Sequence, residues 1–78
     1  PLFEEYSIVR IVELKTANRP FDGSEMVKKT PKVGDTGTIV HITSNSKENI
    51  YIVEKVNSLG QTVWLADFLQ DEIELLTE

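Results

Sequence analysis

Few residues of this chain have the types and spacing that catalysis or metal binding requires. His41 is the only histidine and cysteine is absent, so a metal centre built on these ligands and a Ser/His/Asp arrangement both lack parts. Asp71, Glu72 and Glu74 place carboxylates close together, but nothing beside them predicts the apolar pocket that would raise the pKa of one. We therefore expect no catalytic residue, no metal and no cofactor, and we expect that the chain is not an enzyme.

The run Gly34-Asp35-Thr36-Gly37 partly resembles a phosphate-binding loop. No Gly-Lys-Ser/Thr sequence follows it and no helix is expected to begin there, so the pattern favours a turn. Gly37 is expected at the start of a strand, where a side chain would either clash or force a strained backbone.

Aromatic side chains are the stronger candidates for recognition, because exposed rings often anchor protein partners. Phe21 lies in a polar, turn-rich segment with no evident strand partner, which predicts an exposed anchor with Arg19 close by. Tyr51 and Trp64 are further candidates, although each could instead fill the core. The predicted partner-binding residues are thus Phe21, Arg19, Tyr51 and Trp64, whereas Phe68 is expected in the core.

Short strands are the elements that must position these side chains. Residues 7–14 are rich in β-branched types, and their apolar residues fall on both faces, which predicts a strand partly buried on both sides. Residues 67–70 are expected to form one helical turn capped by Asp67. The expected strands are residues 7–14, 38–42, 50–56, 61–66 and 73–76.

Residues 15–35 contain two prolines, a glycine at position 23 and no regular spacing of apolar residues, so they predict a long irregular loop. We expect residues 15–32 to be the least ordered internal segment. At 78 residues the chain has room for a single domain, residues 1–78. The expected fold is all-β: a five-stranded SH3-like barrel with a long first loop and one helical turn before the last strand.

Charge separates the possible partners. The net charge of −5 opposes binding to nucleic acid, although residues 15–32 sum to +3 and the rest of the chain to −8. Residues 67–78 contain five acids and no base. No apolar run approaches the roughly 20 residues that span a bilayer. We expect a cytoplasmic protein that does not associate with membranes.

The order of motifs resembles a known group of small barrels. Gly34-Asp35-Thr36-Gly37-Thr38-Ile39-Val40 is similar to a glycine signature of SH3-like bacterial proteins and, more loosely, of ribosomal KOW segments. Together with residues 9–11, 51–53 and 64–75, it resembles the electron-transport accessory group. That group includes the C-terminal barrel of the nitrile hydratase β subunit, the variable chain of ferredoxin-thioredoxin reductase and the small extrinsic subunit of photosystem I. Short stand-alone bacterial proteins of unknown function are similar in length. The resemblance implies a barrel that docks onto a partner, and it transfers no catalytic residue.

The leading hypothesis is a non-enzymatic interaction module that binds a protein through the first loop and nearby aromatic residues. The partner can be a different protein or a second copy of the chain. Alternatives are an accessory subunit of a metal or redox enzyme, an immunity-type protein whose acids block a basic toxin, and a KOW-like nucleic-acid binder that uses the loop cations.

Overall fold

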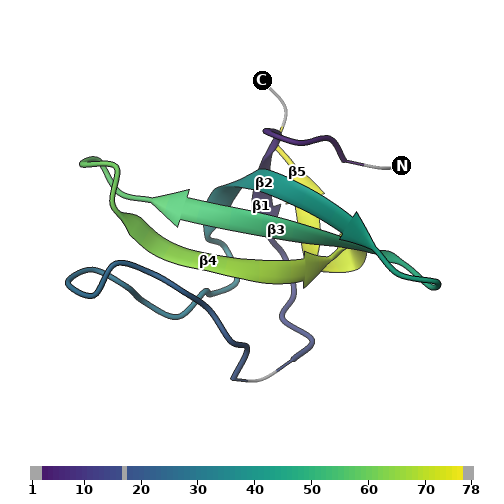
Figure 1. Cartoon of the computed structure of the whole chain (residues 1–78), viewed down its shortest axis with the longest axis horizontal. Coiled ribbons are helices and arrows are strands. Elements are labelled where there is room, and N and C mark those ends of the chain that lie inside the picture. Colours follow the sequence, from purple (N-terminus) through teal and green to yellow (C-terminus); the bar gives the residue numbers. More distant parts are fainter. Residues whose placement is uncertain (1–2, 17, 77–78) are drawn as a thin grey trace.

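A computed structural model describes residues 3–16 and 18–76, and these form one antiparallel sheet (Figure 1). The strands lie side by side in the order β4-β3-β2-β1-β5. In chain order the elements are β1 (Ile8–Ile11), β2 (Thr36–Ser44), β3 (Asn49–Val56), β4 (Thr62–Leu69), the 3-10 turn η1 (Gln70–Glu72) and β5 (Ile73–Leu75). The prediction of five strands in an all-β chain is confirmed. β4 and β5 are the two edges and do not pair with each other in the described part of the chain, so the sheet is not closed.

Alternation along the strands decides which side chains enter the core. In β4, Trp64, Ala66 and Phe68 are buried while the residues between them are not. Trp64 meets Phe68 edge to face, with ring centroids 5.6 Å apart. The core is completed by residues of the other strands: Val9, Ile11, Ile39, Tyr51, Val53 and Ile73.

β1 is shorter than expected and is buried on one face only. Val9 and Ile11 are each 1% exposed, whereas Ile8 and Val12 are 52% and 42% exposed. The prediction that residues 7–14 are partly buried on both sides is therefore wrong for Ile8 and Val12, although Leu14, beyond the end of the strand, packs against the core. The pairing explains the difference, because β1 is flanked by β2 and β5 and its outer face has no second layer in the described residues.

The helical turn is displaced from its expected position. Residues 67–69 continue β4, with Asp67 paired to Ile52 and Phe68 to Tyr51, and the 3-10 turn begins only at Gln70. Asp67 does not cap the turn. A Glu72 side-chain oxygen instead accepts a hydrogen bond from the Leu69 backbone N–H at 2.8 Å. The side chain of the last residue of the turn thus stabilises the start of the turn.

Gly37 lies on β2 close to the backbone of β3. A Cβ at this position would lie 2.7 Å from the Glu54 carbonyl oxygen and 2.8 Å from Val53 Cγ1. The positive backbone φ angles among the glycines belong to Gly34 (98°) and Gly60 (78°), so the requirement at Gly37 is for space. A glycine is needed there because backbone cannot yield as a flexible side chain could.

The first loop, residues 15–32, is fastened along the outer edge of β4. Asp22 and Leu65 exchange two backbone hydrogen bonds, of 3.0 and 2.9 Å. The N–H of Ser24 donates to the Thr62 carbonyl and that of Lys29 to the Val63 carbonyl. Figure 1 shows the loop passing beside β4. The loop is irregular, as predicted, but it is tied to the sheet at several points.

Candidate functional site

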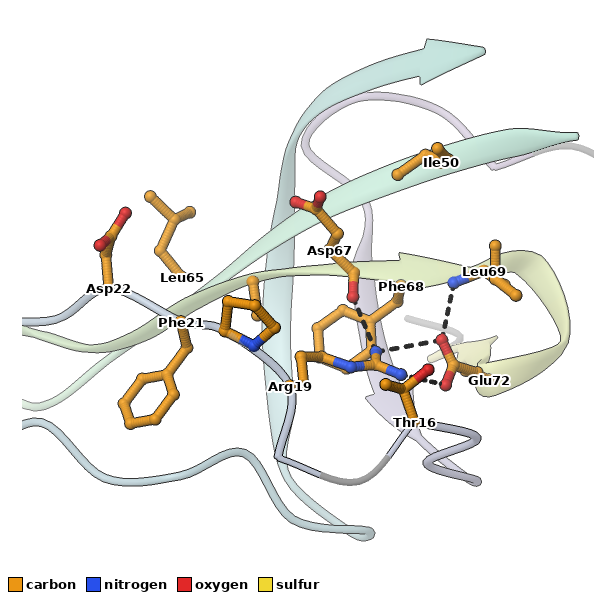
Figure 2. A pocket seen from close by; sticks show the side chains of 12 residues that line it. Thr16, Arg19, Phe21, Asp22, Ile50, Leu65, Asp67, Phe68, Leu69 and Glu72 are labelled. Carbon is orange, nitrogen blue, oxygen red and sulfur yellow. Dashed lines mark hydrogen bonds and ion pairs between the residues drawn. The ribbon is translucent and has the colours of Figure 1, made fainter. Parts of the chain in front are cut away.

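The strongest candidate site is a surface groove of about 470 Å³ between the first loop and the second half of β4. The loop contributes Arg19 and Asp22, among others, and the sheet contributes Leu65, Asp67 and, from β3, Ile50. Figure 2 shows these side chains around the groove. The Asp22–Leu65 backbone pairing holds the two walls at a fixed separation.

Glu72 and Arg19 form an ion pair at the inner end of the groove. Glu72 is 1% exposed and the Arg19 side chain is 10% exposed. Arg19 Nη1 lies 3.0 Å from Glu72 Oε1, and its Nη2 donates to Oε2. The same carboxylate accepts hydrogen bonds from the backbone N–H groups of Lys15 and Leu69, each at 2.8 Å. One buried side chain thus joins the first loop, β4 and the 3-10 turn.

Burial and hydrogen bonding act in opposite directions on the Glu72 carboxyl. Removal from water favours the neutral acid, and it is the largest single influence. The hydrogen bond from Arg19, the two backbone N–H groups and the guanidinium charge all favour the carboxylate, and together they hold the pKa of Glu72 below its ordinary value. The group is therefore an ionised anchor and not a proton donor at neutral pH.

Arg19 is fully engaged within the molecule. Besides the Glu72 carboxylate, its Nη1 donates to the Asp67 carbonyl oxygen at 2.7 Å. Its guanidinium carbon lies 4.7 Å from the centre of the Phe68 ring, a cation–π contact. The sequence nominated Arg19 for partner binding; the structure places it at the groove, but with its charge compensated by Glu72.

The four nominated residues do not form one cluster. Tyr51 and Trp64 are both 0% exposed, so the core interpretation describes them and their side chains offer no surface to a partner. The Trp64 indole Nε1 donates to Asp35 Oδ2 at 3.0 Å, which ties the turn before β2 to the core.

Phe21 is less exposed than the sequence suggested. It is partly buried and packs against the core cluster. Its segment also has a strand partner that the sequence did not indicate, because the residue that follows it, Asp22, pairs with Leu65. In Figure 2 the Phe21 ring points away from the Asp22 and Asp67 carboxylates.

The outer wall of the groove is apolar and acidic. Asp22, Leu65 and Asp67 point to one side of β4 in Figure 2, as expected from the Asp22–Leu65 pairing and the two-residue repeat of the strand. Asp22 and Asp67 are exposed, and neither carboxylate forms an ion pair or a side-chain hydrogen bond within the described residues. Sequence reasoning missed both acids; for Asp67 the signal available was its position between Leu65 and Leu69, two residues from each and so on the same face of a strand.

A second ion pair fastens the loop close to the first. Lys15 Nζ pairs with the Asp71 carboxylate. That hydrogen bond lowers the pKa of Asp71 and raises the pKa of Lys15. Both side chains are in contact with solvent, so this pair stabilises the loop less than the buried Arg19–Glu72 pair does.

The described residues contain neither a side-chain cluster suited to a metal ion nor a membrane-spanning helix. Nowhere in residues 3–16 and 18–76 do three or more His, Cys, Asp or Glu side chains come together in a way that could hold a metal ion. Among the same residues no helix is long and apolar enough to cross a membrane.

Comparison with known proteins assigns no relative. The chain matches no family model, and no curated protein or solved structure is significantly similar to it.

Proposed function

We propose that this chain is a non-enzymatic interaction module of SH3-like barrel type that binds a partner protein at the groove between the first loop and β4. The observation that carries the proposal is the groove itself, whose walls are held by the Asp22–Leu65 backbone pairing and by the buried Arg19–Glu72 pair. A preformed recess with apolar walls suits recognition, because little ordering entropy is lost on binding.

The strand order supports the barrel part of the proposal. Four strands in a meander, with the last strand returning beside the first, give the order β4-β3-β2-β1-β5, which is the order of an SH3-like barrel before its two edges meet. Figure 1 shows that the sheet is curved, and the strand register places the buried side chains of β2, β3 and β4 on one face of it.

The ion pairs that the bases of the loop form favour a protein partner over nucleic acid. Of the five bases in residues 15–32, Lys15, Arg19 and Lys28 form ion pairs with acids of the described chain. These pairs reduce the positive potential that a phosphate backbone would meet, and the net charge of −5 opposes it further.

Site-specific photo-crosslinking in cells of the source organism tests the proposal. A photoreactive phenylalanine analogue replaces Leu65 in the groove wall, and the matched control places it at Leu59, which is 80% exposed in the turn between β3 and β4. We expect one discrete crosslinked protein from position 65 and not from position 59. Crosslinking that is equal at the two positions, or absent from both, would overturn the proposal.

A further inference from the structure

We propose that the groove recognises an extended cationic segment of the partner protein, one in which Lys or Arg and apolar side chains occupy every second position and so project from the same face. This inference rests on the proposed function and adds the chemistry of the ligand. It follows from three properties of the groove: an apolar floor, two uncompensated carboxylates beside it, and a strand edge that is already occupied.

The floor is apolar and accessible. Leu65 and Leu69 of β4 project to the same face of the sheet as Ile50, because Ile50 pairs directly with Leu69 and the β4 residues are separated by two-residue steps. All three are only partly buried. An apolar side chain of the ligand would therefore gain contact area here that the fold itself does not use.

The charge at the groove is negative after internal pairing. Arg19 is neutralised by Glu72, which leaves Asp22 and Asp67 as the ionised groups of the groove wall. Lys29 bonds through its backbone to β4 at Val63, two positions from Leu65, yet its side chain forms no ion pair with either acid in the described structure. A ligand cation would meet two carboxylates next to an apolar floor, where charge complementarity gives specificity.

The ligand cannot bind here by adding a strand to β4. Backbone groups of the first loop already pair with Thr62, Val63 and Leu65, and Arg19 holds the Asp67 carbonyl. Recognition must then come from side chains, and this makes both the charge and the apolar character of the ligand necessary.

Titration of the ¹⁵N-labelled full chain with three short, end-capped peptides tests the inference by NMR. The probe carries leucine and lysine in turn at every second position, with serine between them; one control has glutamate in place of lysine, and the other has serine in place of leucine. We expect saturable shifts only with the leucine–lysine probe, centred on the amides of Asp22, Leu65 and Asp67. Equal binding of the serine–lysine peptide would show that charge alone attracts the ligand. Shifts centred on other amides would show that the peptide binds elsewhere, and no shifts would show that it does not bind. Each of these results overturns the inference.

Paired variants of equal charge separate local from general electrostatics. Asp22→Asn with Asp67→Asn removes two charges at the groove, and Glu4→Gln with Glu48→Gln removes two exposed charges that form no ion pair within the described residues and lie outside the groove lining. We expect the first pair to weaken probe binding about tenfold and the second by less than about twofold, as for solvated ion pairs at an interface. Equal weakening by both pairs contradicts the inference.

Two further outcomes identify other occupants. Amide shifts in the groove that depend on protein concentration without peptide would make a second copy of the chain the occupant and overturn the inference. A discrete crosslink from position 65 together with no peptide binding would leave the proposed function standing and refute only the ligand chemistry.

Discussion

Replacement of Glu72 by Gln tests whether one buried carboxylate fastens the loop to the sheet. The change leaves the volume nearly constant but removes the charge that faces Arg19. It also turns an amide N–H₂ toward groups that only donate, namely the guanidinium and the N–H groups of Lys15 and Leu69. Breaking a buried pair from one side costs about 3 to 5 kcal/mol, a large fraction of the roughly 5 to 15 kcal/mol that stabilises a small domain.

The measurement is urea unfolding at neutral pH, followed by the fluorescence of Trp64, the only tryptophan and a fully buried one. The matched control is Glu74→Gln, which breaks the solvent-exposed pair with Arg10 and should lower the free energy of unfolding by less than about 1 kcal/mol. A loss below about 1 kcal/mol for Glu72→Gln would refute the reasoning.

A double variant shows which of the contacts of Glu72 matter. Arg19→Met with Glu72→Met replaces the ion pair by apolar side chains, a change that is often close to neutral for a pair alone. Here it also leaves the backbone N–H groups of Lys15 and Leu69 without their acceptor, at about 1 to 3 kcal/mol for each one that stays buried. The double variant should therefore remain less stable than the natural chain, and recovery of full stability would show that the pair acts alone.

Four further expectations follow from the same structure. Gly37→Val should lower the free energy of unfolding by about 1 to 3 kcal/mol, because the added side chain meets the backbone of β3. Phe21→Ala, at a partly buried position, should lower it by about 1 kcal/mol. Thermal melting compares the two variants, and a larger loss of stability for Phe21→Ala than for Gly37→Val would be inconsistent with both placements. In hydrogen exchange the Asp22 amide, bonded to β4, should be protected relative to Met26 at the exposed part of the loop, and equal rates would contradict the pairing. Because the pKa of Glu72 is lowered in the folded state, its contribution to stability is complete above the ordinary pKa of glutamate and is lost as the pH falls below about 4. Glu72→Gln should therefore reduce the loss of thermal stability between neutral and acidic pH, as measured by melting across pH. An unchanged loss would show that other carboxyl groups cause it. Titration with duplex DNA at about 150 mM salt should show no saturable binding, and micromolar affinity would favour a nucleic-acid function.

The strands could be predicted because their signal is local. Alternation in residues 50–56 places Tyr51 and Val53 on one face, and both are buried in the structure. The requirement for glycine at position 37 was also readable from the turn cluster before it. Whether a side chain there would clash or would strain the backbone was not readable, because the distance from Gly37 to Glu54 depends on how β2 pairs with β3.

The groove could not be predicted because it depends on pairing between distant segments. Arg19 and Glu72 lie 53 positions apart, and no local pattern links an arginine in a loop to one acid among several near the end of the chain. The helical turn was misplaced for a related reason: Asp67 resembles a cap in the local sequence, but pairing with Ile52 keeps it in the strand. Exposure of aromatic residues was likewise a tertiary property, since Tyr51 and Trp64 are in the core.

The way in which the first loop lies along β4 bears on how the molecule avoids self-assembly. An edge strand with unpaired backbone groups is a template for aggregation, and β4, with eight residues, is the longer of the two edges. The other edge, β5, has only three residues, which is too short to recruit a neighbour effectively. Release of the loop would uncover the long edge together with Leu65 and Leu69. The Asp22–Leu65 pairing and the buried Arg19–Glu72 pair, which hold the loop in place, thus also block intermolecular sheet extension at this edge.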